Sequence, residues 1–222
     1  LPPLEEQRRI VAKLDRAFES LSRARTLAEA NLADAKALFE RALDQVFTEA
    51  PDSWSVASLS ELCSKIGSGA TPRGGAAAYK KKGISLIRSL NVHDRNFRLK
   101  KLAFIDDQQA EKLANVIVEE NDVLFNITGA SIARCCIVPT EILPARVNQH
   151  VSILRSDRTR LLPEFLCFLL TSDNRKKTLL QVGLDGGATR QAITKAQLQS
   201  LTVPFPTSTA EQQGVIDELQ LV

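Results

Sequence analysis

The stretch 5–47 contains neither glycine nor proline and consists mostly of Ala, Leu, Glu, Arg and Lys, which are good helix formers. Apolar residues recur in it at alternating steps of three and four, at ten of eleven positions from Val11 to Val46, with Arg25 the exception. A mean spacing of 3.5 residues is the coiled-coil period. We therefore predict one helix from Glu5 to Phe47, on the order of 60 Å long, with an apolar seam that one small domain cannot cover.

The charges of this helix point to pairing and spacing as its function. Between Glu5 and Asp44, eight acidic residues balance eight basic ones, so the helix has zero net charge and is a poor candidate for binding a highly charged ligand. A helix folded back along its own domain stays open as an alternative, because many seam positions are alanine. The residues expected to pair with another helix are Val11, Leu14, Phe18, Leu21, Leu32, Phe39 and Val46.

A boundary follows at Pro51, where turn-forming residues interrupt the helical pattern. From Trp54 onward, short runs of strand composition alternate with polar turns and a few helical patches. The fold class predicted is α+β: a long coiled-coil-type helix followed by a mixed α/β globular domain. The expected strands are 84–87, 102–105, 123–127, 133–138 and 151–154, and the expected helices are 107–113, 163–172 and 194–201.

The beginning of the chain is repeated near its end. Glu6-Gln7 matches Glu211-Gln212, Ile10-Val11 matches Val215-Ile216, and Leu14 matches Leu219. Repeats of this kind expose modular architecture. Here a unit made of a helix and a domain begins again as the chain ends.

Basic residues are concentrated between Lys65 and Lys101, where ten Lys and Arg face one acidic residue, Asp94. The segment carries a formal charge of +9, although the whole chain carries only +3. A solvated surface explains such a run equally well. The other explanation is a phosphate-binding surface. Each phosphate that such a surface neutralises releases counterions and adds affinity that is independent of sequence.

The motifs of several enzyme classes are missing from the sequence. Neither an (Asn/Asp/Ser)-Pro-Pro-(Tyr/Phe) site nor a glycine-rich methyl-donor or nucleotide loop occurs, and no acidic set for a nuclease metal follows Pro51-Asp52. His93 and His150 have no spacing typical of a ligand set or a triad. We expect a non-enzymatic chain with no catalytic residue, metal or cofactor.

The four cysteines lie mostly among apolar neighbours and form no CxxC pair with matching histidines. We interpret Cys63, Cys135, Cys136 and Cys167 as free thiols, mostly buried, in a reducing compartment. The sequence holds no apolar run of membrane-spanning length, and its first residues do not have the form of a signal peptide. A cytoplasmic location is the expectation.

An ordered set of motifs resembles the specificity subunits of type I restriction-modification enzymes. Leu-Pro-Pro-Leu-Glu-Glu-Gln at the start and Val-Pro-Phe-Pro with Ala-Glu-Gln-Gln at the end are similar to the conserved regions of that family. Its target recognition domains resemble the part between them. The segments that carry this resemblance are Gly67–Pro72, Gly83–Arg88, Asn121–Gly129, Val147–Val151 and Gly187–Ile193.

The resemblance implies a division of the chain and a set of partners. Residues 1–50 would form the long conserved-region helix, 51–204 a target recognition domain, and 205–222 the start of a second conserved helical region. The implied partners are double-stranded DNA with a bipartite target, a methyltransferase (M) subunit, a restriction (R) subunit and, through the long helix, a second copy. A full specificity subunit has two of each part, and the missing Met favours a fragment over a natural half-subunit.

Side chains suited to phosphates and base edges gather near the ends of the expected strands. Arginine pairs well with guanine, and Asn or Gln with adenine. A structural role in turns remains the alternative for each of them. The candidate DNA-binding residues are Lys65, Ser68, Thr71, Arg73, Lys80, Lys81, Lys82, Arg88, Ser89, Asn91, Arg95, Thr128, Ser131, Arg134, Asn148, Gln149, His150, Arg190 and Gln191.

Two other functions stay open at this point. A coiled-coil assembly scaffold would explain the seam but not the basic segment. A recognition domain from a single-chain restriction-methylation enzyme would explain both, with its methyltransferase domain outside this sequence.

Overall fold

A computed structural model describes residues 1–184 and 192–221 of the chain. The chain forms two units, residues 1–42 and Leu43–Leu221. Helix α1 runs from Leu4 to Thr48, which confirms the helix expected from the absence of breakers and the apolar repeat. The last turn and a half of α1 therefore belong to the second unit.

The first unit is helical and its side chains are exposed from Arg8 to Leu38. The seam residues Phe18, Leu21 and Leu32 keep 64%, 65% and 57% of their surface in contact with solvent. The end of α1 is different, because Leu43 is fully buried and Val46 packs against the core of the second unit. The assignment of Val46 to helix pairing was therefore wrong: this side chain contributes to the core of its own domain.

The second unit mixes short strands with short helices, as expected for an α+β domain. Its strands are β1 (Ser55–Ser58), β2 (Cys63–Ser68), β3 (Ile84–Ile87), β4 (Val92–His93), β5 (Asn96–Phe97), β6 (Ala103–Ile105), β7 (Ile117–Val118), β8 (Val123–Asn126), β9 (Cys135–Ile137), β10 (Ala145–Val147), β11 (Val151–Ser156) and β12 (Thr202–Phe205). Its α-helices are α2 (Leu59–Leu62), α3 (Asp107–Glu111), α4 (Pro163–Thr171), α5 (Asp173–Leu184), α6 (Lys195–Ser200) and α7 (Thr209–Leu221). Short 3-10 turns are η1 (Gly75–Ala78), η2 (Ser89–Asn91), η3 (Ala114–Val116), η4 (Gly129–Ser131) and η5 (Thr140–Ile142).

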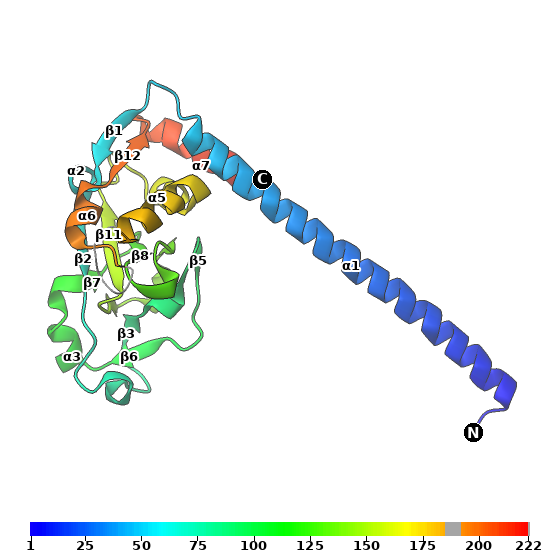
Figure 1. Cartoon of the computed structure of the whole chain (residues 1–222). Helices are drawn as coiled ribbons and strands as arrows, with labels where there is room; N and C mark the ends of the chain where they lie inside the picture. The colour runs from blue at the N-terminus through cyan, green and yellow to red at the C-terminus, as the bar shows by residue number, and fades with distance from the viewer. Residues whose placement is uncertain (185–191, 222) are drawn as a thin grey trace. The chain divides into compact units, whose positions relative to one another are not determined.

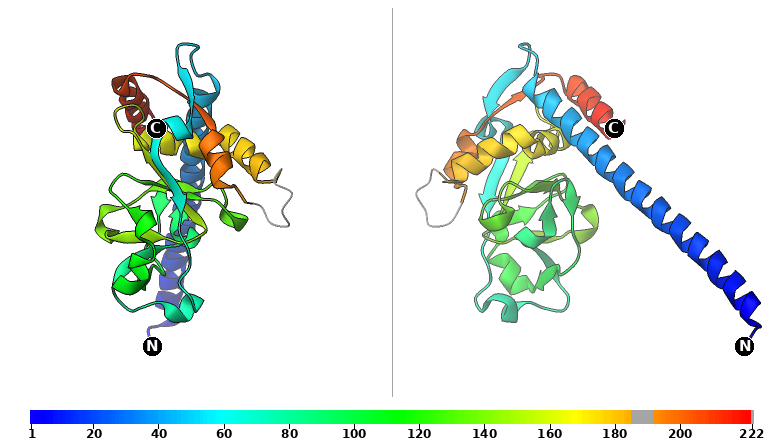
Figure 2. Two further views of the ribbon diagram at one scale, coloured as in Figure 1. Left: turned by 90° about the vertical axis from the view of Figure 1, so that its left-hand side faces the viewer. Right: turned by 45° about the vertical axis from the view of Figure 1, so that its right-hand side comes forward.

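Two four-stranded sheets form the centre of the domain. One has the order β6-β3-β10-β7 and the other β2-β11-β8-β9, while β1 pairs with β12 and β4 with β5. Figures 1 and 2 show β1, β12 and α7 at one end of the domain and β3, β6 and α3 at the other. The antiparallel β1–β12 pair joins the first and last parts of the domain, so both ends of its chain are held together.

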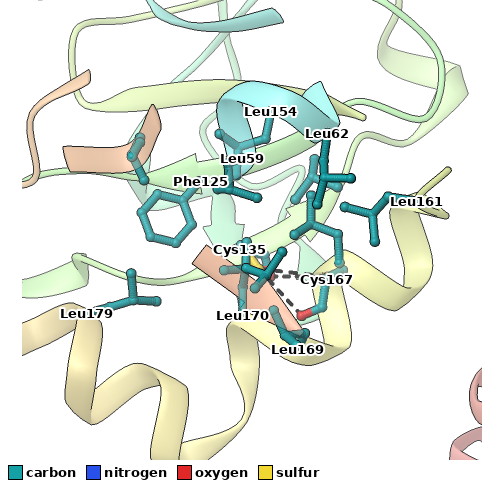
Figure 3. Packing of buried hydrophobic residues seen from close by; sticks show 14 of the residues in the cluster. Leu59, Leu62, Phe125, Cys135, Leu154, Leu161, Cys167, Leu169, Leu170 and Leu179 are labelled. Carbon is teal, nitrogen blue, oxygen red and sulfur yellow. Dashed lines mark hydrogen bonds between the residues drawn. The ribbon is translucent and has the colours of Figure 1, made fainter. Parts of the chain in front are cut away.

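The sheet β2-β11-β8-β9 is covered on both faces. Because successive side chains of a strand point to opposite faces, Val123 and Phe125 of β8 pack into one core cluster and Leu124 into the other. Figure 3 shows part of the first cluster, which contains Phe125 and Leu154 from the sheet and Leu169 and Leu170 from α4. The second cluster fills the space against β3, β6 and β10. This double burial explains why the strands read as continuous apolar runs.

The cysteines behave as the sequence predicted. All four are free; Cys135, Cys136 and Cys167 are buried, and Cys63 is partly buried. Burial raises the pKa of the Cys63 thiol to about 12, so this thiol stays protonated at neutral pH. Within the described residues, no helix combines the length and the apolar character needed to cross a membrane.

Candidate nucleic-acid interface

Four loops meet at one edge of the two central sheets. Strands β3 and β10 are parallel, with Ile87 opposite Val147, so both end at the same edge. A turn of three residues then leads from β10 to β11. Strand β11 runs antiparallel to β8, which brings its first residue, Val151, opposite the last residue of β8, Asn126. Strand β2 also ends here, with Ser68 opposite Ser152. We call the loops 69–72, 88–91, 127–134 and 148–150 the loop edge.

Hydrogen bonds hold these loops to one another. The backbone N–H of Asn148 donates to the carbonyl oxygen of Ile87 over 3.0 Å, and that of Ile127 to His150 over 3.0 Å. The buried side chain of Asn126 donates from Nδ2 to the carbonyl oxygen of Ser89 over 2.9 Å. The loop edge is therefore positioned by rigid strands and not by the loops alone.

A hollow of about 420 Å³ opens at the loop edge. It brings together candidates from three separate clusters of the sequence: Ser89 after β3, Thr128 with Ser131 and Arg134 after β8, and His150 before β11. The remaining lining residues are Leu90, Gly129 and Ala130. Sequence reasoning did not name these three, although Gly129 stands in a quoted motif, because apolar and small residues carry no chemical signal of their own.

Polar side chains link the loops in a chain of hydrogen bonds. Thr71 Oγ1 donates to Gln149 Oε1, which leaves the amide nitrogen of Gln149 facing His150 Nε2 at 3.1 Å. An amide nitrogen can only donate, so this contact fits the His150 tautomer in which Nε2 accepts and Nδ1 carries the proton. In that tautomer Nδ1 donates to Thr128 Oγ1, which lies 2.6 Å away. The orientation of His150 in the hollow is thus fixed by Thr128 on another loop and by its neighbour Gln149, which Thr71 holds from a further loop.

The two arginines of the loop edge differ in what engages them. The guanidinium of Arg88 donates to the carbonyl oxygen of Lys101 and lies over the Tyr79 ring, 5.1 Å from its centre. For Arg134, in contrast, no hydrogen bond or ion pair joins its guanidinium to another described residue. Arg134 is the arginine of the hollow that is available to a ligand.

His93 lies close to Arg134, but its imidazole is uncharged at pH 7. Burial and the nearby guanidinium groups of Arg98 and Arg134 lower its pKa, in that order of effect, so the imidazole is neutral at pH 7. The positive charge beside the hollow therefore comes from arginine.

Two asparagines predicted to contact DNA are instead occupied within the fold. Asn91 is fully buried; its Nδ2 donates to the carbonyl oxygen of Arg98 over 2.8 Å and its Oδ1 accepts from the Arg88 N–H. Asn148 is 4% exposed, and its Oδ1 accepts from the His150 N–H. The assignment of Asn91 was wrong, because a buried amide held at both ends by backbone groups cannot reach a base edge without losing them. Only Oδ1 of Asn148 is held in this way, so a contact of Asn148 with DNA stays a prediction.

The other candidates lie outside the hollow. Lys65 and Ser68 line a second hollow of about 590 Å³ with Lys195, and Thr71 and Arg73 a third of about 430 Å³ with Lys112. The sequence did not single out Lys112 and Lys195, which line these two hollows. Arg95 lies beside Glu164 and Phe168.

The lysine run lies at the start of β3, whereas the hollow lies at its end. Lys80 pairs with Asp106 at 3.0 Å, and Lys81 and Lys82 are exposed. Arg190 and Gln191 lie outside the described residues.

Gly69 allows the loop 69–72 to approach the loop 148–150 closely. Its N–H donates to the carbonyl oxygen of Asn148 over 3.1 Å, and a Cβ at this position would overlap the carbonyl oxygen of Val147. We expect Gly69→Ala to destabilise the domain by about 1–3 kcal/mol, because backbone must move to admit the methyl group. Gly67→Ala is the matched control, since a Cβ there meets no atom within 4 Å. Urea unfolding of both variants checks this, and equal midpoints would contradict it.

Comparison with known proteins identifies the family of the domain. A family model, the Type I restriction modification DNA specificity domain, matches residues 51–220. The putative type I restriction enzyme MjaX specificity subunit of Methanocaldococcus jannaschii is 22% identical over 167 residues, which are 74% of this chain and 38% of that protein.

Solved structures show the same fold. A chain from a study of complex assembly in a type I R-M system has 24% identity and a TM-score of 0.70, covering 100% of this chain and 52% of that one. The HsdS subunit from Thermoanaerobacter tengcongensis has 24% identity and a TM-score of 0.64, covering 100% and 51%. This chain thus spans about half the length of those two. The match of the family model over most of the sequence shows that this chain belongs to the family of type I restriction-modification DNA specificity domains.

Proposed function

We propose that this chain recognises a specific sequence of double-stranded DNA, as all or part of the specificity subunit of a type I restriction-modification complex. The observation that carries the proposal is the loop edge, where candidates from three sequence clusters line one hollow beside an unengaged Arg134. Arginine, histidine and hydroxyl side chains on rigidly held loops are suited to base edges in a groove.

We also propose how the parts share this function. Residues 51–204 form the recognition domain, the helix of residues 1–50 pairs and spaces, and 205–222 begin a second conserved helical region. The chemistry belongs to partner methyltransferase and restriction subunits, so this chain is not itself an enzyme. A bipartite DNA target would follow from two recognition domains in one complex. We place the function in the cytoplasm, because its four free thiols suit a reducing compartment.

Fluorescence anisotropy with a labelled duplex of random sequence tests DNA binding first. We expect the full chain to bind at about 50 mM salt and to lose affinity steeply towards about 200 mM, because phosphate contacts release counterions. No binding at either salt concentration would contradict the proposal. It would favour an assembly scaffold.

The lysine run should contribute to affinity without contributing to specificity. Replacing Lys81 and Lys82 with alanine should weaken binding to every duplex alike and reduce the slope of log affinity against log salt by roughly one for each phosphate that is no longer neutralised. Adding Lys80→Ala should change little, because Lys80 already pairs with Asp106. Anisotropy titrations at several salt concentrations measure this, with Lys177→Ala on α5 as the control. Loss of binding to one sequence only would refute the assignment.

The exposed seam of α1 should pair with another helix, most simply that of a second copy. Burying side chains such as Phe18 and Leu32 contributes about 1.5–3 kcal/mol each. We expect the chain to sediment as a dimer at micromolar concentration and Leu32→Asp to sediment as a monomer. Ala30→Asp is the control, because residue 30 lies about 200° around the helix from residue 32. A wild-type monomer that also fails to bind the methyltransferase subunit would contradict the pairing.

A further inference from the structure

The loop edge exposes one large apolar side chain, that of Leu90. Among the residues of the loop edge, all of which the structure describes, Ile127 and Ile132 are buried in the core, whereas Leu90 is 40% exposed. Leu90 lines the hollow together with Ala130 and Gly129. An exposed leucine is ordinary on a protein surface. Here, however, it contributes an apolar wall to a hollow whose other lining groups are hydroxyls, an imidazole and a guanidinium.

The short turn that carries Leu90, η2, is held on both sides of this residue. Before it, the carbonyl oxygen of Ser89 accepts from Asn126 Nδ2 over 2.9 Å. After it, the fully buried Asn91 accepts at Oδ1 from the Arg88 N–H over 3.1 Å, and its Nδ2 donates over 2.8 Å to a carbonyl oxygen seven residues further along the chain. Leu90 therefore has little backbone freedom to lose when it meets a ligand.

The second turn that lines the hollow, η4, is fixed as well. It carries Ala130 and Ser131, and the N–H of Ile132 closes it by donating to the carbonyl oxygen of Gly129 over 3.0 Å. Ile132 itself packs into the first core cluster, which anchors the turn to the domain. Arg134 follows two residues later. Two held turns thus bring apolar groups and hydrogen-bond donors to one hollow.

This combination of groups matches one base better than the other three. In the major groove guanine presents two acceptors, cytosine a donor, and adenine an acceptor and a donor, whereas thymine presents an acceptor, O4, beside a C5-methyl group. Leu90 and Ala130 are suited to cover that methyl group, because its burial removes apolar surface from water. The hydroxyls of Ser89 and Ser131 and the guanidinium of Arg134 supply donors for O4 and for the base beside it.

We propose that the hollow reads a thymine by packing Leu90 and Ala130 against its C5-methyl group, next to the base that Arg134 contacts. The inference rests on the proposed recognition of double-stranded DNA and deepens it, because it names one base and the side chains that select it. Burial of a single methyl group makes the contact worth about three- to tenfold in affinity. Cytosine at this position would lose the methyl contact and would also present a donor in place of the O4 acceptor.

Uracil substitution tests the methyl contact without changing the protein, since uracil keeps the hydrogen-bonding groups of thymine and lacks only the methyl group. The probe is the duplex that the full chain enriches from a randomised library, with each thymine replaced by uracil in turn. We expect one replacement to weaken binding about three- to tenfold, beside the base pair at which Arg134→Ala loses preference. A motif without thymine, equal affinity for all of these duplexes, or a sensitive thymine remote from that base pair would overturn the inference. A chain that enriches no motif would instead overturn the proposed function.

A Leu90→Ala variant assigns the contact to this side chain. It should lose most of the difference in affinity between the sensitive duplex and its uracil counterpart, because the group that covers the methyl is gone. Val56→Ala is the control and should keep the wild-type difference: Val56 is an exposed aliphatic residue of β1, which precedes the start of β2, whereas the loop edge follows its end. A wild-type difference in Leu90→Ala would overturn the inference. If this variant does not fold, the uracil substitutions decide, since they use the unchanged chain.

Discussion

An Arg134→Ala variant should bind its preferred duplex about 10- to 100-fold more weakly than the wild type, equivalent to about 1–3 kcal/mol, and should lose preference at one base pair. The reason is that the Arg134 guanidinium lines the hollow with no partner among the described residues, so its hydrogen-bonding capacity remains for DNA. Its backbone stays in place, because Asn126 N–H donates to the Arg134 carbonyl oxygen and alanine preserves that bond.

Titration of preferred and scrambled duplexes measures the effect. Arg158→Ala is the matched control, since Arg158 is exposed and follows the far end of β11 from the loop edge. We expect the control to bind both duplexes almost like the wild type. An equal loss of affinity for both duplexes in Arg134→Ala would mean that Arg134 contacts phosphate and does not read a base.

An Asp122→Ala variant should lose about 3–5 kcal/mol of unfolding free energy, the largest stability effect we expect from one substitution. Asp122 is completely buried directly before β8. Its carboxylate binds the Arg155 guanidinium through two hydrogen bonds of 2.8 and 2.9 Å and also accepts from the Glu119 N–H over 2.7 Å. Removing the carboxylate leaves the mostly buried Arg155 charge with a weaker set of partners.

Urea unfolding at pH 7 measures this loss, and Glu120→Ala is the control, because Glu120 is an exposed acid two residues away. Asp122→Asn should fall between the two, since an amide keeps hydrogen-bonding capacity but not the charge. The ion pair joins β8 to β11, whose ends carry the loop edge, yet it lies at the other end of both strands. We therefore expect the folded fraction of Asp122→Ala to bind DNA normally. A loss below about 1 kcal/mol would contradict the importance of the pair.

The local pattern of the sequence predicted several elements closely. Strand β3 has the predicted bounds, and β8 and β11 begin where expected. Strand β9 begins at Cys135, two residues later than predicted. Ala133 adopts a left-handed backbone conformation with φ of 65°, which ends the preceding loop and cannot be read from an apolar run.

Long-range packing explains what the sequence did not predict. Helix α5 was missed, because Asp173–Leu184 combines charged residues and a glycine in a pattern with little apolar periodicity. The burial of Gln212 was also not predictable, since a glutamine becomes a core residue only when backbone groups distant in sequence meet it.

The sequence also predicted only part of the candidate site. Three clusters of suitable residue types were found from their positions after or before strands, but their convergence depends on the parallel pairing of β3 with β10 and on the short turn into β11. Asn91 was misassigned because the sequence does not show which groups its side chain contacts. Its residue type suits adenine, but only the fold shows that backbone groups already satisfy it.

Selection of binding sites from a randomised duplex library tests the central claim most directly, namely that the loop edge reads DNA sequence. The wild-type chain should enrich one short motif. A Ser131→Ala/Arg134→Ala double variant should enrich a motif relaxed at adjacent positions, while the Lys81→Ala/Lys82→Ala variant should enrich the wild-type motif with lower yield. An unchanged motif from the double variant, or no enrichment by a wild-type chain that binds the library, would contradict the claim.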